Sequence, residues 1–346
     1  MKPIGIILGL GIGLLVGLLY GIDKKKPQWW QILAISLLCL ACLVNLVPPL
    51  STNLQVAKNV IKMKSDILIP IKLTPTAAIQ DYHSFSAFEV KYNNITDTLL
   101  TSKEIAANLS LNTTYIVESK YDTTLNKFYS DKIVSTSPSI SYPFIPTLKD
   151  RIRIMNFHVP VAWVCVISFL LSMIYSIKYL KKRDLYYDLV ASSAASIGLL
   201  YTILATVTGM LWAKFNWGAY WNWDPRETSI FFLLLIYFAY FGLRTAIEND
   251  EQKARLSSVY SILAFVTVPF FIFVLPRITT GLHPGSKDES NSGPVLSASQ
   301  NMLDSQLLIG FAISLAAFII IYFWIFNLRV RTAKAEHKYE LLKFNK

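Results

Sequence analysis

The chain has 346 residues, 53% of them hydrophobic, and a formal net charge of +11. Its mean hydropathy is +0.42, whereas soluble domains are only about 45–50% apolar even when glycine is counted. The composition excludes a purely soluble protein. It also disfavours a nucleic-acid-binding protein, because the basic residues are not gathered on a folded soluble face.

Apolar stretches long enough to cross a bilayer recur along the chain. About 20 apolar residues span a hydrocarbon core of ~30 Å. The first stretch lacks the small-residue cleavage site of a signal peptide, so we expect it to be retained as a span. Seven spans are predicted, at residues 3–22, 29–47, 159–177, 189–212, 228–243, 257–274 and 303–326.

Lysine and arginine are shared unequally between the two sets of loops. Positive residues accumulate on the cytoplasmic side of membrane proteins, and a basic tail also favours anionic lipid. We therefore expect the C-terminus inside, and the N-terminus, residues 211–227 and residues 276–302 outside. The basic residues gather in residues 24–26, 178–183 and 244–255 and in the tail after Phe326.

A polar stretch of about 100 residues separates the second and third predicted spans. Strand-like segments at 87–92, 114–119 and 132–135 lie between turn-forming clusters, and residues 102–109 favour a short helix. We predict an all-α polytopic transmembrane helix bundle of about seven spans with a β-rich extracytoplasmic insert. The expected parts are two N-terminal spans (1–49), the insert (50–153), a five-span core (154–328) and a basic cytoplasmic tail (329–346).

The most distinctive stretch lies between the fourth and fifth predicted spans. Four of the chain's eight tryptophans fall there within 12 residues. An aromatic belt at the lipid headgroups explains one or two tryptophans at each span end, but not four at a single end beside charged residues. A dense aromatic shelf suits a flat, amphipathic, anionic ligand better. Its residues are Trp212, Trp217, Trp221 and Trp223, followed by Asp224, Arg226 and Glu227.

Two of the four histidines are expected on the same side of the membrane as this tryptophan-rich loop, close to the ends of predicted spans. His158 precedes the third predicted span and His283 falls between the sixth and seventh, on the same outer face. A pair of neutral imidazoles can ligate iron on both faces of a porphyrin. Pro160 favours the first turn of a helix, so we expect His158 at a helix N-terminus, where the dipole disfavours imidazolium. No role is predicted for His83 or His337.

The carboxylates of a porphyrin need cationic partners. Arg226, Lys214 and Arg277 are the outer basic residues closest to these elements, and guanidinium suits carboxylate best. Asp224 cannot serve the propionates, so we expect it to orient a histidine, a backbone N–H or Arg226, or to cap the fifth span. The predicted haem b site has His158 and His283 as metal ligands, with Trp212, Trp217, Trp221, Trp223, Asp224 and Arg226 around them.

The segment from Trp217 to Ser229 resembles the tryptophan-rich signature of the haem-handling proteins of cytochrome c biogenesis, the CcmC, CcmF and CcsA superfamily. Residues 153–163 and 282–284 resemble the two histidine regions of the CcmC branch, and the likeness covers about residues 151–327. The resemblance implies that His158 and His283 are axial haem ligands beside an external tryptophan platform. CcmC-like proteins present haem to a haem chaperone, whereas CcsA and CcmF attach it to apocytochrome c.

The favoured function is therefore haem transfer, which requires no bond-making by this protein. The CcsA and CcmF branches hold a second haem with histidines inside their spans, and the predicted spans here contain none. The alternative is a CcsA-like synthetase subunit, a cytochrome c haem lyase. A secondary transporter is disfavoured because the spans carry few polar groups.

The resemblance also implies a cellular setting. We expect the bacterial inner membrane, with the haem site on the periplasmic side. The expected partners are a haem chaperone, other membrane subunits of cytochrome c maturation and an ABC transporter. Apocytochrome c is a direct partner only in the synthetase alternative. No role is assigned to residues 50–153.

Overall fold

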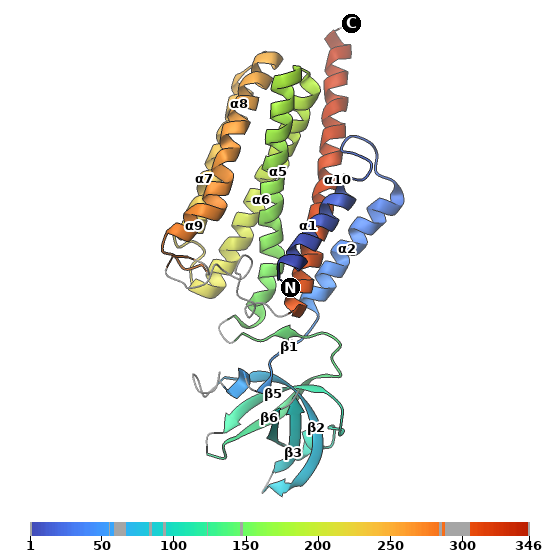
Figure 1. Cartoon of the computed structure of the whole chain (residues 1–346), viewed down its shortest axis with the longest axis vertical. Coiled ribbons are helices and arrows are strands. Elements are labelled where there is room, and N and C mark those ends of the chain that lie inside the picture. The colour runs from blue at the N-terminus through green and yellow to red at the C-terminus, as the bar shows by residue number, and fades with distance from the viewer. Residues whose placement is uncertain are drawn as a thin grey trace. The chain divides into compact units, whose positions relative to one another are not determined.

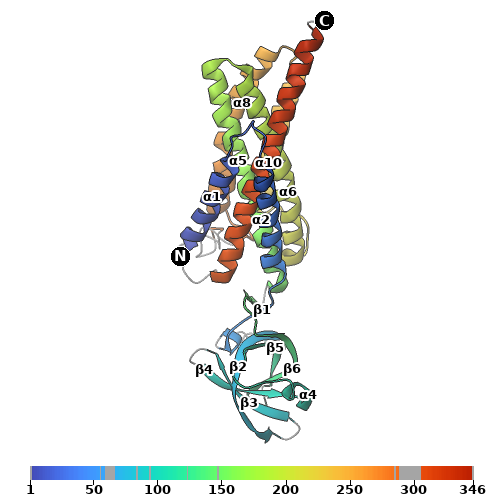
Figure 2. The ribbon, with the colours of Figure 1, turned by 90° about the vertical axis from the view of Figure 1, so that its right-hand side faces the viewer.

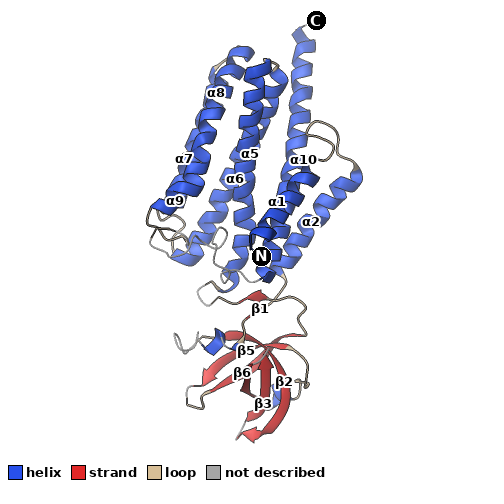
Figure 3. Cartoon of the chain, in the orientation of Figure 1, coloured by secondary structure: helices blue, strands red, loops and turns tan. Residues whose placement is uncertain are grey.

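The chain forms two units, one helical and one built mainly of strands (Figures 1 and 3). The helical unit comprises Met1–Cys42 and Arg153–Lys346, and the other comprises Leu43–Ile152. His83 and Pro284 lie outside the residues that the structure, a computed structural model, describes. Those residues are 2–54, 56–58, 67–82, 85–92, 95–122, 124–145, 148–283, 286–287 and 305–344.

Six helical segments of the described residues are long and apolar enough to cross a membrane. A seventh helix, α1 (Lys2–Leu18), is apolar but shorter, with its apolar part at Gly5–Leu18. This architecture fits a polytopic membrane protein. The six segments are α2 (Gln28–Leu46), α5 (Ile152–Lys182), α6 (Leu185–Trp217), α7 (Pro225–Ala246), α8 (Asp250–Pro269) with its extension through η2 (Phe270–Val274) and α9 (Leu275–Ile278), and α10 (Ser305–Phe344).

The start of α5 corrects the expected position of His158. A short 3-10 turn, η1 (Lys149–Arg151), leads directly into α5 at Ile152, seven residues before the predicted span. His158 and Pro160 both lie inside the helix, so the expectation that His158 flanks a helix N-terminus is wrong. Hydropathy marks where an apolar surface begins, whereas this helix begins earlier with the buried side chains of Ile152 and Met155.

A stripe of glycines joins α1 to α10, which lie side by side (Figure 2). The stripe consists of Gly5, Gly9, Gly13 and Gly17, one in every fourth position. At each of them an added Cβ would lie within 3.0 Å of an atom of α10. At Gly9 that atom is the backbone carbonyl oxygen of Ala312, at 2.8 Å. Small residues at such intervals allow two membrane helices to approach closely, so the stripe sets the spacing between α1 and α10.

Replacing Gly9 with alanine should therefore weaken the packing of α1 on α10. A backbone carbonyl cannot move aside as a side chain can, so we expect an overpacking cost of about 1–3 kcal/mol. Gly11 is the matched control, because an added Cβ there meets nothing within 4 Å. Thermal unfolding of the purified protein in detergent should show a lower midpoint for Gly9→Ala than for Gly11→Ala. Equal midpoints would show that the close approach is unimportant for stability.

The second unit is a closed barrel of five strands in the order β2-β3-β4-β6-β5. Only β4 and β6 pair in parallel, and the other pairs are antiparallel. This order and closure are those of an OB-fold. The barrel strands are β2 (Ile69–Tyr82), β3 (Phe85–Tyr92), β4 (Ile95–Thr101), β5 (Tyr115–Asp122) and β6 (Lys127–Thr136), with a short parallel pair, β1 (Leu50–Ser51) and β7 (Tyr142–Pro143), outside it.

The helix predicted at residues 102–109 is shorter than expected. Helix α4 spans Lys103–Ala106, between β4 and β5, and the Ser102 hydroxyl accepts a hydrogen bond from the backbone N–H of Ile105. The N-cap was thus predictable. The C-terminal end was not, because Asn108 and Leu109 form turn hydrogen bonds to Ile105 and Ala106 instead of continuing the helix.

Candidate functional site

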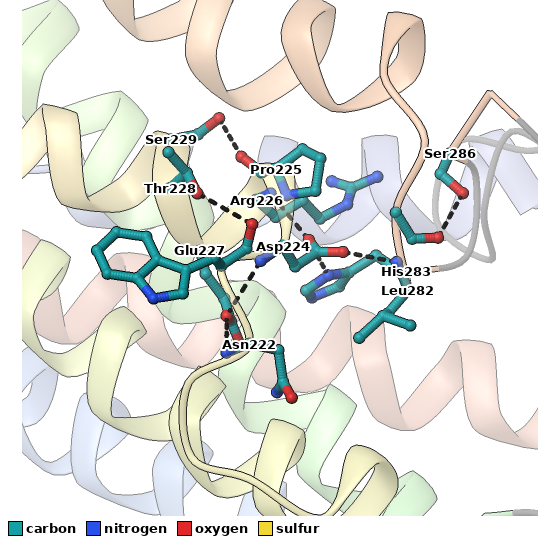
Figure 4. Close-up of polar contacts among 12 residues, drawn as sticks. Asn222, Asp224, Pro225, Arg226, Glu227, Thr228, Ser229, Leu282, His283 and Ser286 are labelled. Carbon is teal, nitrogen blue, oxygen red and sulfur yellow. Dashed lines mark hydrogen bonds and ion pairs between the residues drawn. The ribbon is translucent and has the colours of Figure 1, made fainter.

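The site is organised around the N-terminus of α7, where a capping box caps the first turn of the helix (Figure 4). The Asp224 side chain accepts a hydrogen bond from the backbone N–H of Arg226 at 2.9 Å. The Glu227 carboxylate reaches back to the backbone N–H groups of Asn222, at 2.6 Å, and Asp224, at 3.4 Å. Pro225 occupies the first helical position. These contacts satisfy N–H groups that a helix start leaves without partners.

The same Asp224 carboxylate holds the loop that carries His283. The Nδ1–H of His283 donates to Oδ1 of Asp224 at 2.6 Å, and the backbone N–H of Leu282 donates to Oδ2 at 2.7 Å (Figure 4). An added Cβ at Gly281 would lie 2.7 Å from Asp224 Oδ2 and 2.9 Å from Pro225 Cδ. A glycine is therefore required for the loop to come this close to α7.

The charge on Asp224 follows from these donors. Burial alone would raise the pKa of this carboxyl, but the hydrogen bond and charge of His283 and the backbone N–H groups of Arg226 and Leu282 lower the pKa to about 2. The carboxylate is ionised at all physiological pH values, and its contribution to the stability of the fold is lost only as the pH falls through this low value. An ionised carboxylate can only accept, so His283 carries a proton on Nδ1, and in the neutral imidazole the Nε2 lone pair is then free for a metal.

His158 is held in the same tautomer by a different partner. Its Nδ1 lies 2.9 Å from the hydroxyl oxygen of Thr208, on α6. That hydroxyl lies 2.8 Å from the carbonyl oxygen of Leu204, to which it donates its proton. Its lone pair therefore faces the imidazole and accepts the Nδ1–H. The Nε2 lone pair of His158 is left for a metal in turn. Gly209 leaves room for the ring, since an added Cβ would lie 3.1 Å from Cε1.

Three of the residues selected from the sequence come into electrostatic range of one another. His158, inside α5, interacts with His283, after α9, and with Arg226, at the start of α7. These residues are far apart in the chain, so the helical bundle is what brings the two imidazoles and the guanidinium into one region.

The tryptophans are arranged in two groups. The Trp217 ring meets the His283 ring edge-on, with centroids 4.5 Å apart. Trp221 and Trp223 form a second edge-on pair, with centroids 5.7 Å apart. Trp212 lies half-buried within α6, and no ring contact among the described residues joins it to either pair. The structure thus associates Trp217 with a histidine, whereas Trp212 stands apart.

Trp223 is displayed by an unusual backbone conformation. Its φ is +56°, in the left-handed region that bulky residues rarely adopt, and its side chain is 68% exposed. The turn is held on both sides, because Glu227 binds the N–H groups of Asn222 and Asp224 and the Thr228 hydroxyl donates to the Trp223 carbonyl at 3.3 Å. Backbone strain maintained in this way is typical of ligand-binding loops.

The expected cationic residues have different surroundings. Lys214 donates to the Gly218 carbonyl at 3.0 Å and lies over the Tyr220 ring at 5.3 Å, so it caps the end of α6. In the part of the chain that the structure describes, the Arg226 guanidinium has no hydrogen bond or ion pair. Arg226 therefore remains available to an anionic ligand.

Sequence reasoning missed Thr208 and Gly281. Thr208 was one hydroxyl among several in an apolar stretch, and nothing in the sequence pairs it with His158, 50 positions away. Gly281 lies two residues before His283, and a glycine beside a candidate ligand could have indicated a close backbone approach. The capping role expected of Asp224 is present in the structure, and so is its contact with a histidine.

Comparisons with known proteins agree with these features. Residues 143–344 match the family CcmC, heme exporter protein C. The heme exporter protein C of Bradyrhizobium diazoefficiens is 31% identical over 171 residues, which cover 49% of this chain and 62% of that protein. That of Paracoccus denitrificans is 33% identical over 135 residues, covering 39% and 56%. A cytochrome c biogenesis protein CcsA of Fagopyrum esculentum is 30% identical over 116 residues, covering 34% and 35%.

The chain thus spans less than two thirds of the length of each of these relatives. The family match itself covers more than half of this chain and includes every residue of the site described above. The chain therefore belongs to the CcmC family of cytochrome c biogenesis proteins.

Proposed function

We propose that this protein binds haem b at the outer face of the membrane, between His158 and His283, and hands it on during cytochrome c maturation. The observation that carries the proposal is the pairing of the two imidazoles. Nδ1 of each lies within hydrogen-bond distance of an oxygen, of Thr208 or Asp224, that can accept its proton, and a neutral imidazole held in this way would offer Nε2 to a haem iron. The names of the relatives, heme exporter protein C, support haem as the cargo.

The other site residues fit the same cargo. When bound, haem would supply an iron that the two imidazoles can ligate. Trp217 packs against the edge of His283 and limits rotation of that imidazole, while Trp221 and Trp223 offer indole faces to a flat ring. The free guanidinium of Arg226 suits a propionate. Trp212, which lies near the end of α6, is included in this proposal only because it adjoins the tryptophan-rich loop.

The proposed setting is the bacterial inner membrane. The distribution of lysine and arginine favours a cytoplasmic C-terminus with the haem site on the periplasmic side. The glycine stripe that packs α1 against α10 supports α1 as a seventh, retained span. The hydrogen bonds from Asn327 of α10 to the carbonyls of Ile22 and Lys24, after α1, support it as well. Residues 154–328 would then form the haem-handling core, and residues 50–153 an extracytoplasmic insert.

Two roles remain candidates for this haem site. In the first, the protein passes haem to a haem chaperone, together with other maturation subunits and an ABC transporter. In the second, it acts as a CcsA-like synthetase subunit on apocytochrome c, a role that the 30% identity with a CcsA protein supports. Transfer requires no bond-making residue.

The haem content of the purified full chain tests the proposal. We expect one haem per chain with the absorption spectrum of low-spin, bis-imidazole iron, measured by a haem stain and by quantitation of extracted haem. Absence of haem, also after addition of haemin, would contradict haem binding. A second haem per chain would favour the synthetase role over transfer.

A further inference from the structure

We propose that a groove between α7 and α8 binds an anionic phospholipid of the membrane, with Arg255 contacting the phosphate of its headgroup and the apolar walls holding an acyl chain. The proposal does not depend on haem binding. The groove lies at the end of these two helices opposite to the capping box of α7 and to the loop that carries His283, so it is separate from the proposed haem site.

The groove is a space of about 380 Å³ between the last turns of α7 and the first half of α8, two helices that pack against each other. All but one of its lining side chains are apolar or aromatic. A bound water needs about 2–4 polar partners, which such walls do not offer, so an apolar chain fills this space better than water does. The lining residues are Leu243, Arg255, Leu256, Val259, Tyr260 and Leu263.

The walls of the groove are held in place and open toward the outside of the bundle. The Tyr260 hydroxyl donates to the carbonyl of Ile236 on α7 at 2.9 Å, which fixes this ring of α8 against α7. Leu256, Val259 and Leu263 follow one another at three- and four-residue intervals and therefore share a face of α8. They are 41%, 43% and 65% exposed. In a membrane helix such side chains face lipid, so an acyl chain can enter the groove from the bilayer.

Arg255 is the cation of the groove, and its guanidinium is free to bind an anion. It is exposed, and within the described residues it makes no hydrogen bond or ion pair. The other cations at this end of the two helices are already paired. Arg244 contacts both oxygens of Asp188, at 2.7 and 2.9 Å, and Lys253 contacts Asp250 at 2.9 Å. An additional anion at this place would therefore be held by Arg255.

The position of Arg255 in the sequence matches the level of the lipid headgroups. Helix α8 begins at Asp250, and no charged residue follows Arg255 until Arg277. Glu251 lies one turn before Arg255, but no ion pair joins the two in the described part of the chain. A guanidinium forms short, charge-assisted hydrogen bonds with phosphate, and basic sites between membrane helices attract anionic headgroups. A phosphate at Arg255 thus places the acyl chain along the groove.

The alternative is an ordinary lipid-facing surface that binds all phospholipids alike. The test compares phosphatidylglycerol, which is anionic, with phosphatidylcholine, which is zwitterionic and carries the same acyl chains. Each is titrated into the delipidated full chain in detergent, and bound lipids are counted by native mass spectrometry. The variants are Arg255→Gln and Val259→Trp. Lys253→Gln is the matched control, because it removes an equal charge two residues away and outside the groove.

We expect the wild type to bind one phosphatidylglycerol more tightly than phosphatidylcholine. Arg255→Gln should remove this preference by weakening phosphatidylglycerol binding about 5- to 10-fold, the usual effect of losing a charge-assisted hydrogen bond near the membrane surface. Lys253→Gln should match the wild type with both lipids. Val259→Trp should weaken the binding of both lipids, because the indole occupies the space of the acyl chain.

Three results would overturn the proposal. The first is a wild type without a preference between the two lipids. The second is an equal loss in Arg255→Gln and Lys253→Gln, which would show only a general attraction to the basic end of the bundle. The third is unchanged binding of both lipids by a folded Val259→Trp variant. If Val259→Trp does not fold, the comparison of Arg255→Gln with Lys253→Gln decides the proposal alone, because both substitutions are conservative in size.

Discussion

Replacing either His158 or His283 with alanine should abolish the low-spin spectrum of the haem-loaded protein. Each substitution removes one of the two axial nitrogens, so the remaining complex is five-coordinate and absorbs differently. Removal of a side chain that orients a metal ligand commonly costs 10- to 100-fold in metal affinity, and loss of a ligand itself should cost more, above about 100-fold. Absorption spectra and haem content of the purified variants measure both effects.

His337 provides the matched control for this experiment. It is exposed near the end of α10, so His337→Ala should keep the wild-type spectrum and haem content. Added imidazole should restore the low-spin spectrum in His158→Ala and His283→Ala, because it can occupy the space of the deleted ring. Wild-type spectra in both histidine variants would refute the assignment of the ligands.

The substitution Asp224→Asn should lower haem affinity about 10- to 100-fold without removing a ligand. An amide has one acceptor oxygen, whereas Asp224 uses both oxygens, one for Leu282 and one for Arg226 and His283. If the amide oxygen stays with Leu282, the amide N–H faces Nδ1 of His283. The imidazole then becomes an acceptor at Nδ1, and its proton moves to Nε2, where it blocks the iron. Haem titration followed by absorption measures the loss.

Glu227→Gln separates this tautomer effect from damage to the helix cap. Glu227 completes the capping box but contacts neither histidine, and the amide oxygen of glutamine can still accept from Asn222. We expect a near-wild-type haem affinity for Glu227→Gln. If this variant loses as much affinity as Asp224→Asn, then the shape of the loop matters and the tautomer of His283 does not.

The sequence alone predicted which residues are candidates for the site, but it did not predict where all of them lie in the helices. Tryptophans and histidines are rare in this chain, so their clustering was visible without a structure. The local geometry of His158 could not be predicted, because α5 begins at Ile152, before the apolar stretch. The dipole argument for a neutral imidazole therefore fails, and Thr208 of α6 fixes the tautomer instead. Contacts across 50 residues leave no pattern in a single sequence.

The strands of the barrel were also only partly predictable from the sequence. The strand segments predicted at 87–92, 114–119 and 132–135 overlap β3, β5 and β6, but β2 and β4 were not predicted. In β2 the alternate residues Ile69, Ile71 and Leu73 are buried, as a strand requires. The same strand contains two prolines, Pro70 and Pro75, which argue against a strand in the sequence. The order of the strands, which defines the fold, depends on pairings that sequence periodicity does not reveal.

The two imidazoles have different hydrogen-bond partners, and this difference affects the order in which they would release haem. A carboxylate makes its imidazole a stronger electron donor than a hydroxyl does, and Asp224 stands behind His283 whereas Thr208 stands behind His158. In the proposed complex His158 would therefore hold the haem iron less strongly than His283. An acceptor would displace His158 first, and His283 would keep hold of the haem until it was displaced in turn.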